Sequence, residues 1–434
     1  MSTTISADTR GTTATSASAA GRDFGDVVEG LEHREEGRPL PGRYYTDPAV
    51  LDADLALVFE RQWFLAATEA QIAEPGDYVT IDLGARSIII VRDDDEQVRA
   101  FHNVCRHRGA RILTETSGFV GNLVCGYHSW TYSTDGTLRH APGLPPGTDM
   151  ACLGLRPVAV RAIAGLVYLC LADEPPADID DFAKLVEPYL APHGLATAKV
   201  AAVDDLIEQG NWKLVMENNR ECYHCDGHPE LACTFFLTYG MEPDQVPERL
   251  RATFERSLTA ESDLRARCTE LGLPFELVEN LSEPNVAHRV AREALDGAGE
   301  SFSLTGEAIV SKSLGGLSER KLGRLSIHTQ PNAWMHILSD HAIMFSVLPL
   351  SADRTLVRSV WLVPADAVEG VDYDLDALML VWRRTNEQDS TFVGLAQAGV
   401  TDPAYVPGPY TETESHLEEF MRWYASRMSE GYRR

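Results

Sequence analysis

Short runs of alternating or β-branched apolar residues occupy the chain between residues 63 and 171. Three of them, at 78–83, 87–93 and 98–104, are separated by polar turn residues, and residues 165–171 form a further run. Alternation with a period of two is typical of half-buried strands, and β-branched residues favour the extended backbone. The pattern therefore predicts a compact all-β unit across this part of the chain.

Helical periodicity precedes this unit. Residues 47–67 place Leu51, Leu55 and Val58 on one stripe, which is the spacing of an amphipathic helix. Asp47 stands at the start of the stripe, where an aspartate can accept hydrogen bonds from the first free backbone N–H groups. The pattern predicts a helix that leads into the β unit.

The second half of the chain mixes strands and helices. Residues 206–231 begin as a strand and continue as a helix. Residues 327–350 predict paired strands that turn near Ser339 and Asp340, and residues 354–363 continue the sheet. Further helices are predicted at residues 175–195, 371–398 and 415–428.

These patterns predict a flexible N-terminal segment followed by two domains. The segment covers residues 1–40, a β-rich domain with its leading helix covers 41–170, and the second domain covers 171–434. Within the second domain, residues 243–295 are strongly charged and predict a helical insertion. Such an insertion could act as a lid or could only decorate the surface.

Length and charge agree with this division and exclude some partners. A chain of 434 residues is too long for one simple core. Its net charge of −27 argues against binding nucleic acid, whose phosphates require a basic face. The same charge argues against docking on an anionic membrane. We therefore expect a protein that binds neither nucleic acid nor membrane.

The cysteines predict metal binding rather than a disulfide framework. Several lie close to histidines, which suits a reducing compartment. They are Cys105, Cys125, Cys222, Cys225 and Cys233. The sequence contains neither an apolar run of about 20 residues nor a basic and apolar secretion signal at its start. A cytoplasmic protein is expected.

Two histidines, His224 and His228, stand four residues apart in the predicted helix. Side chains at this spacing project from one face of a helix, so two imidazoles can bind one metal ion. Asn218 and Glu221 add polar groups just before them. The alternative is an amphipathic surface helix with incidental histidines, and the pair alone does not decide between the two.

A second set of metal-binding residue types lies about a hundred residues earlier. Cys105, His107, Cys125 and His128 form the pattern Cys-x-His-x17-Cys-x2-His. This ligand set can form a structural zinc site. In a Rieske [2Fe-2S] centre, two cysteines bind one iron and two histidines the other, and here each half of the motif supplies one of each. Both halves lie between predicted strands, which favours the Rieske centre.

The segments CRHRGARI and CGYHSWTYSTDG resemble the Rieske domain of the Rieske non-haem iron oxygenases, over residues 60–170. NWKLVMENNRECYHCDGHPEL resembles the catalytic iron segment of the same family. The resemblance implies an α+β fold. It would combine an all-β Rieske [2Fe-2S] domain with a helix-grip-like catalytic domain, in which helices flank a central antiparallel sheet.

The resemblance also implies roles for individual residues. His224 and His228 would bind a mononuclear iron together with Asp389, which lies in the matching late segment NEQDSTFVGLAQAG. Glu221 matches the carboxylate that bridges this site to a Rieske histidine of a neighbouring subunit, and Asn218 matches a polar residue near the open iron positions.

Three points depart from this pattern or compete with it. Three residues separate His224 from His228, where many family members have four. Asp340 is a competing carboxylate for the third ligand position. Cys222 and Cys225 have the spacing of a thiol redox pair, although no βαβ pattern surrounds them.

The family's cofactors and partners follow from the resemblance. They are a Rieske [2Fe-2S] cluster, a mononuclear non-haem Fe(II), O2, and NAD(P)H that delivers electrons through a separate reductase. A homotrimer is expected, because the cluster of one subunit would serve the iron of the next. A Rieske electron carrier without catalysis is a remote alternative, because free carriers do not need the additional C-terminal part.

The substrate is predicted from the segment ENNRECYHC and the SDHA turn near residue 340, which look like the quaternary ammonium branch. Glycine betaine is the first candidate, hydroxylated on an N-methyl group that is then lost as formaldehyde. An aromatic or natural-product substrate is the alternative. Aromatic side chains usually hold a trimethylammonium group. The candidates for such a cage are Phe235, Phe236, Tyr239, Trp334 and Phe345.

Overall fold

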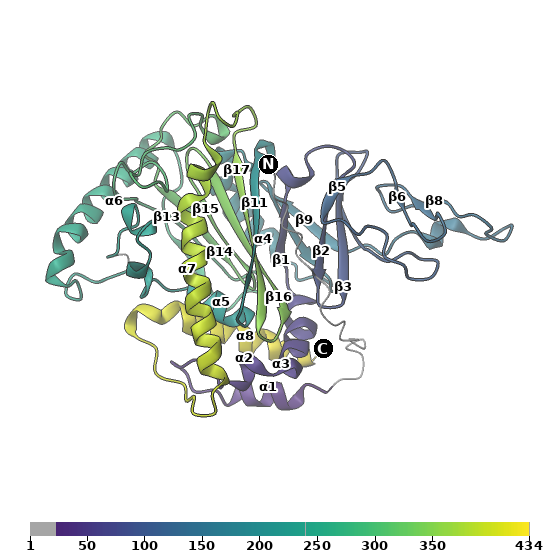
Figure 1. The fold of residues 1–434 in the computed structure, drawn as a ribbon, viewed down its shortest axis with the longest axis horizontal. Helices are drawn as coiled ribbons and strands as arrows, with labels where there is room; N and C mark the ends of the chain where they lie inside the picture. Colours follow the sequence, from purple (N-terminus) through teal and green to yellow (C-terminus); the bar gives the residue numbers. More distant parts are fainter. Residues whose placement is uncertain (1–22, 239, 434) are drawn as a thin grey trace, which may run out of the picture.

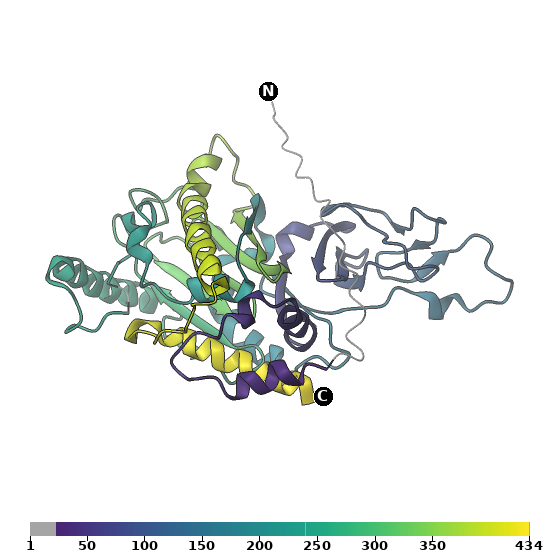
Figure 2. The ribbon, with the colours of Figure 1, turned by 60° about the horizontal axis from the view of Figure 1, so that its bottom comes forward.

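The computed structural model describes residues 23–238 and 240–433. Figure 1 shows a smaller β part beside a large sheet, with α7 running across the sheet and α8 beneath it. Figure 2 shows the same arrangement after rotation, with the β part extending away from the larger part. Helices and antiparallel strands are mixed, and the predicted α+β class is confirmed. The domain boundaries near residues 40 and 170 stay predictions.

The β part consists of short antiparallel strands in three small sheets, ordered β4-β3-β2-β5, β1-β10-β9 and β6-β7-β8. Ile88, Ile89 and Ile90 of β3 are fully buried, as their β-branched run predicts. The strands are β1 (Phe64–Thr68), β2 (Asp77–Leu83), β3 (Arg86–Arg92), β4 (Val98–His102), β5 (Ser117–Phe119), β6 (Leu123–Val124), β7 (Thr131–Tyr132), β8 (Leu138–His140), β9 (Ala159–Ile163) and β10 (Leu166–Cys170).

The predicted flexible lead is partly wrong. Residues 1–22 lie outside the described residues, but α1 (Gly25–Glu32) is a helix. Its apolar residues Val27, Val28 and Leu31 are buried, and α1 packs against α8. Burial of these side chains stabilises a helix that is too short to be stable alone.

The predicted leading helix ends earlier than expected. Asp47 accepts a hydrogen bond from Ala49 N, so it caps α3 (Pro48–Ala53) as predicted. The helix continues as the π-helical turn η1 (Asp54–Phe59), and β1 then pairs with β10. Pairing with a strand about a hundred residues away overrides the local helical pattern at residues 64–67.

The larger part contains a seven-stranded antiparallel sheet, ordered β11-β17-β16-β15-β14-β13-β12. The predicted pair at 327–350 is three strands, because the chain also turns at Gln330-Pro331. The turn at Ser339 and Asp340 lies where it is predicted. The strands are β11 (Lys199–Glu208), β12 (Val278–Asn280), β13 (His288–Glu293), β14 (Arg324–Thr329), β15 (Ala333–Ile337), β16 (Ala342–Ser351) and β17 (Arg354–Val363).

The helices of the larger part cover this sheet and its ends. They are α4 (Ile179–Leu190), α5 (Trp212–Asn219), α6 (Arg251–Leu271), α7 (Leu375–Thr401) and α8 (Ser415–Arg433), and α2 (Arg43–Thr46) lies near the N-terminus. No helix of the described residues is long and apolar enough to cross a membrane.

The predicted helical insertion at residues 243–295 is only partly helical. Residues 251–271 form α6, which projects outward in Figure 1. Residues 278–280 and 288–293 are the strands β12 and β13 of the main sheet. The charged residues of β13 obscured its strand pattern, although five of its six residues are buried.

The two faces of the sheet differ in chemistry. Successive strand residues point to opposite faces. The face that packs with α4 is aliphatic, with Leu325, Ile327, Met335 and Ile337 in one core cluster. The opposite face packs with α7. It buries aromatic and polar side chains, listed here as Ser326, Trp334, His336 and Phe345. A buried face with polar groups indicates a site rather than a plain core.

A buried charge cluster fixes α5, which precedes the histidine pair. Asp54 accepts hydrogen bonds from Trp212 Nε1 at 2.8 Å, Lys213 Nζ at 2.5 Å and Tyr424 OH at 2.5 Å. Both members of the Lys213–Asp54 pair are fully buried. The cluster joins η1, α5 and α8, which are far apart in the sequence. Removal of one partner would leave a buried charge unpaired, so these segments are held together.

Glu217 predicts a pH-dependent stability. Burial raises its pKa from 4.5 to about 8, and the Tyr45 hydroxyl donates to its Oε1 at 2.9 Å. A raised folded-state pKa contributes stability that is full below pH 4.5 and lost as the pH rises through about 8. Glu217→Gln should therefore unfold like the native chain at pH 4.5 but be more stable by about 2–4 kcal/mol at pH 8. Urea unfolding at both pH values measures this.

The exposed Glu255→Gln change on α6 is the control and should leave the pH dependence unaltered. Equal stability of Glu217→Gln and the native chain at pH 8 would contradict the prediction.

Candidate metal centres

Two matching loops present the four residues of the Cys/His motif. Cys105 N donates to Ala110 O, and Gly109 N donates to Cys105 O. Residues 125–130 repeat these two bonds, from Cys125 N to Trp130 O and from Ser129 N to Cys125 O. Gly109 and Ser129 occupy equivalent positions, and both have a positive φ, of 75° and 57°. The loops are therefore built alike, each presenting one cysteine and one histidine.

The cysteines lie inside and the histidines outside. Cys105 and Cys125 are buried, whereas His107 is exposed and His128 half-buried. The two imidazole centroids are 4.7 Å apart, and Trp130 stacks on His107 at 4.9 Å. Two thiolates can thus bind an inner metal ion and two imidazoles an outer one.

The geometry distinguishes a two-iron cluster from zinc. Four ligands of one tetrahedral zinc ion lie within about 4 Å of one another, because each is about 2.0–2.3 Å from the metal. Within residues 23–238 and 240–433, one group of three or more His, Cys, Asp or Glu side chains has all its ligand atoms within 4.8 Å of one another. That group does not contain the four residues of the Cys/His motif. The four residues fit a wider [2Fe-2S] cluster.

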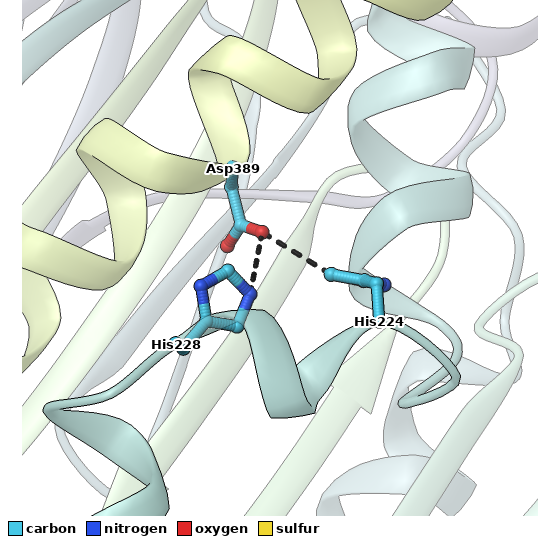
Figure 3. Close-up of side chains that lie close together, drawn as sticks. All are labelled: His224, His228 and Asp389. Carbon is cyan, nitrogen blue, oxygen red and sulfur yellow. Dashed lines mark hydrogen bonds and ion pairs between the residues drawn. The ribbon is translucent and has the colours of Figure 1, made fainter.

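That compact group consists of His224, His228 and Asp389, which Figure 3 shows converging. Asp389 Oδ1 lies 3.2 Å from His224 Nε2 and 3.2 Å from His228 Nε2. The contact with His228 lacks hydrogen-bond geometry, so this buried nitrogen has no hydrogen-bond partner. Two imidazoles and one carboxylate form the facial ligand set of non-haem iron, so the residues fit such an ion.

The histidines are brought together by a turn and not by a helix, which corrects the prediction. α5 ends at Asn219, and a short 3-10 turn at Cys225–Gly227 lies between His224 and His228. Pro229 disfavours helical geometry at the residue before it, and His228 has φ −111° and ψ 87°. The ring centroids are nevertheless only 5.3 Å apart.

Neighbouring side chains orient both rings toward a metal. The Glu221 carboxylate binds His224 Nδ1 at 2.6 Å, and Gln388 Oε1 accepts from His228 Nδ1 at 2.9 Å. With the proton on Nδ1, each Nε2 presents a lone pair to the space beside Asp389. Asn218 Nδ2 lies 3.2 Å from His224 Nε2, so the predicted polar neighbour is also present.

The electrostatics of this group suit a cation. Burial lowers the pKa of His224, but hydrogen bonds with Asp389 and Glu221 reverse this and raise it to about 10. Burial raises the pKa of Asp389, and the two histidines lower it overall. A divalent metal can replace the protons that these carboxylates attract to the imidazoles.

The prediction of reduced cysteines is wrong at one position, because Cys222 and Cys225 form a disulfide. It closes a loop around His224, between Glu221 and the 3-10 turn. The spacing of the two cysteines was itself a signal of a thiol redox pair, but the absence of a surrounding βαβ pattern argued against it. Cys105 and Cys125 are free thiols in this structure.

Asp340, the competing carboxylate, is used elsewhere. It is fully buried and accepts hydrogen bonds from Ser301 Oγ at 3.0 Å, Ile309 N at 2.8 Å and Val310 N at 3.2 Å. It does not belong to the group formed by His224, His228 and Asp389. Its bonds hold the backbone around residue 310.

Two neighbours of Asp389, one amide and one carboxylate, were missed by the sequence analysis. One of them is Gln388, which stands beside Asp389 in the sequence. Glu208 is buried at the end of β11, and burial followed by the nearby Asp389 raises its pKa to about 8. No local sequence signal indicates Glu208, because the strand and α7 meet only in the fold.

The proposed aromatic cage is partly assembled. Trp334 and Phe345 stack at 4.9 Å, and the Arg324 guanidinium lies 4.5 Å from the Phe235 ring centre. Phe236 lines a separate groove beside α6. Tyr239 lies outside the described residues.

The structure adds Trp382, His336 and Phe302 to these aromatic residues. Trp382 precedes Asp389 by seven residues, two turns of α7, so both lie on one face of the helix about 10 Å apart. That spacing was visible in the sequence.

Two protein families match the chain. Residues 62–160 match the Rieske [2Fe-2S] domain, and residues 195–430 match the ring hydroxylating alpha subunit (catalytic domain). The first range contains both Cys/His loops, and the second contains the group formed by His224, His228 and Asp389.

Similar proteins include some that extend over nearly the whole chain and one that covers less than half of it. The glycine betaine monooxygenase oxygenase subunit of Chromohalobacter salexigens is 39% identical over 94% of this chain and 90% of its own length. The protein of the same name from Pseudomonas aeruginosa strain UCBPP-PA14 is 39% identical over 92% and 91%. The carnitine monooxygenase oxygenase subunit of Escherichia coli K12 is 33% identical over 45% and 53%.

Solved structures share the fold. The quaternary ammonium Rieske monooxygenase CntA with L-carnitine has a TM-score of 0.66 and 20% identity, over 92% of this chain and 98% of that one. Naphthalene 1,2-dioxygenase with indole has a TM-score of 0.63 and 21% identity, over 91% and 93%. With its Rieske [2Fe-2S] domain and its mononuclear iron domain, the chain belongs to the Rieske non-haem iron oxygenases, as an oxygenase alpha subunit.

Proposed function

We propose that this chain is the terminal oxygenase that hydroxylates an N-methyl group of a quaternary ammonium compound, with glycine betaine as the first substrate. The product would lose formaldehyde, so the net reaction is N-demethylation. The observation that carries the proposal is the convergence of His224, His228 and Asp389 in a chain 39% identical to glycine betaine monooxygenase oxygenase subunits.

His224, His228 and Asp389 would hold the iron on one side. When bound, a facial site of this kind activates dioxygen at its open positions. Glu221 and Gln388 fix the two imidazoles, and Asn218 adds a polar side chain beside His224. The residues of the chain therefore supply the ligands and their orientation.

Electron entry would use Glu221. One of its oxygens already binds His224 Nδ1, and the chain around it is partly exposed. The β6–β8 end of the β part, which contains the Rieske motif, lies far from α7 in Figure 1. A neighbouring subunit would therefore bring a Rieske histidine to Glu221. A homotrimer and a separate reductase fed by NAD(P)H follow from this proposal, and inter-subunit electron transfer is described for one similar structure.

The aromatic side chains support a quaternary ammonium substrate. A trimethylammonium group has no hydrogen-bond donor, and the faces of Trp and Phe attract it. Trp334 and Phe345 lie on the α7 face of the sheet, with Trp382 at 5.3 Å from Phe345. A cytoplasmic location stays a prediction from the sequence.

Formaldehyde release tests the proposal. The purified oxygenase with NADH, a reductase and O2 should release formaldehyde from glycine betaine, carnitine or proline betaine in step with oxygen uptake. Release from aromatic acids alone would favour the alternative substrate class, since a 2,4-dinitrotoluene dioxygenase component is 35% identical over 40% of the chain. A chain that passes electrons but consumes no oxygen with any substrate would be a carrier, and the proposal would be wrong.

A further inference from the structure

Five arginines are buried among the described residues, and three of them pair with acids. Arg289 pairs with Glu279 and Glu293, Arg324 with Glu293, and Arg427 with Glu430. Arg220 and Arg292 have no such ion pair within residues 23–238 and 240–433. A buried guanidinium without an anion is unfavourable unless something else compensates its charge.

Arg292 is compensated by neutral acceptors. Its Nε donates to Pro274 O at 3.4 Å, its Nη1 to Leu322 O at 3.2 Å, and its Nη2 lies 3.2 Å from His193 Nε2. Each nitrogen has a partner. Arg292 lies in β13, three residues after Arg289, so the two side chains point to opposite faces of the sheet. Arg292 is on the same face as Val290, which packs with α4, and it therefore faces away from α7.

Arg220 is compensated less completely. Its Nη1 donates to Asn219 Oδ1 at 2.8 Å, and its Nη2 donates to Gln330 Oε1 at 3.0 Å and to Thr329 O at 3.4 Å. Its Nε has no acceptor among the described residues. The amide Nε2 of Gln330 is also buried without a partner. Two neighbouring side chains thus hold unused N–H donors around one positive charge. An anion that accepts from both would satisfy them.

The position of Arg220 connects this donor pair with the catalytic site. It directly follows α5, between Asn218, which contacts His224, and Glu221. Its Nη2 also contacts Ala333 O at 3.4 Å, next to Trp334 of the aromatic stack. Burial lowers the pKa of Arg220 to about 9, because no acid nearby offsets the loss of solvent. The donors therefore lie at the start of β15, one residue before Trp334 of the aromatic stack.

We propose that Arg220 and Gln330 form a buried subsite for the carboxylate of the substrate. The ligand class is a small zwitterion, with a quaternary ammonium group against Trp334 and Phe345 and a carboxylate a few bonds away on Arg220. Arginine suits this task, because its planar N–H groups match the two oxygens of a carboxylate. The subsite rests on the proposed function, and it would select betaines over choline, which has the same head but no carboxylate.

Calorimetric titration of the purified holoenzyme with three probes tests the subsite. The probes are glycine betaine, choline, and 3,3-dimethylbutanoate, which keeps the carboxylate but has an uncharged head. In Arg220→Gln we expect Kd to rise about 100-fold for glycine betaine and for 3,3-dimethylbutanoate, and less than about 3-fold for choline. Gln330→Met should show the same pattern with a rise of about 10-fold.

Arg292→Gln is the matched control, because it removes another buried arginine without an acid partner from the opposite side of the sheet. It should leave all three affinities near their native values. Equal losses for choline and glycine betaine in Arg220→Gln and Gln330→Met, or native affinities in both, would overturn the subsite. If the native enzyme demethylates betaines while both variants bind normally, the subsite alone is wrong. If the native enzyme neither binds nor demethylates any quaternary ammonium compound, the proposed function fails with it.

Discussion

Asp389→Ala should lose the mononuclear iron and keep the Rieske cluster. The carboxylate lies 3.2 Å from both imidazole nitrogens and is the only acid in the group. Without it, two neutral imidazoles remain to hold a divalent cation. Loss of a residue that only orients a ligand already lowers metal affinity about 10–100-fold. Loss of a ligand itself should therefore lower the iron affinity about 100-fold or more. Formaldehyde release should fall by more than about 100-fold. Iron and sulfide analysis, with the Rieske EPR signal, measures the two centres separately.

Glu387→Ala is the control for this change, because Glu387 is exposed on the same helix two residues away. It should retain both centres and native turnover. Loss of the Rieske signal together with the iron in Asp389→Ala would mean that the variant is damaged more widely, and full iron content would contradict the assigned ligand.

Glu221→Gln should retain both metals and slow turnover by about 100-fold. Oε1 of the native carboxylate binds His224 Nδ1 at 2.6 Å, and Oε2 accepts from Tyr223 N with a second lone pair left for another imidazole. Glutamine has nearly the same shape, but it offers one acceptor and one donor, so it cannot accept from two imidazoles at once. The link to a neighbouring subunit's histidine would be weakened while the iron ligands stay in place.

A single-turnover experiment locates this defect. The reduced enzyme is mixed with O2 and glycine betaine, and the oxidation of the Rieske cluster is followed by its absorbance. Slow oxidation with native substrate affinity is expected. Asp226→Asn, an exposed carboxylate in the same loop, should behave like the native enzyme. Native oxidation rates in Glu221→Gln would rule out the bridging role.

Most of the residues assigned to the two metal centres could be predicted from the sequence because they are local. Cys105 and His107, and likewise Cys125 and His128, belong to loops whose composition carries the pattern by itself. Asp389 was accessible only through the family resemblance, since an isolated aspartate in a helix carries no signal. The helix predicted through His228 was wrong because Pro229 and a nearby disulfide decide the local backbone.

The parts that could not be predicted depend on contacts between distant segments. β13 is highly charged and becomes a strand because β14 pairs with it, and β1 forms because β10 lies beside it. Likewise, His336 stacks on Trp382 at 4.5 Å across the sheet and α7, which no local pattern relates. The sequence also does not indicate that Arg220 is buried without an acidic partner among the described residues.

The cluster around Asp54 has a consequence for how the chain is made on the ribosome. Asp54 emerges early, Lys213 follows in the middle, and Tyr424 is supplied by the last helix. The aspartate cannot reach its buried position among these three partners until nearly all of the chain has been synthesised. The nascent N-terminal half must therefore remain soluble without its final partners, and a shortened chain that ends before α8 would expose this charged cluster to quality-control proteases.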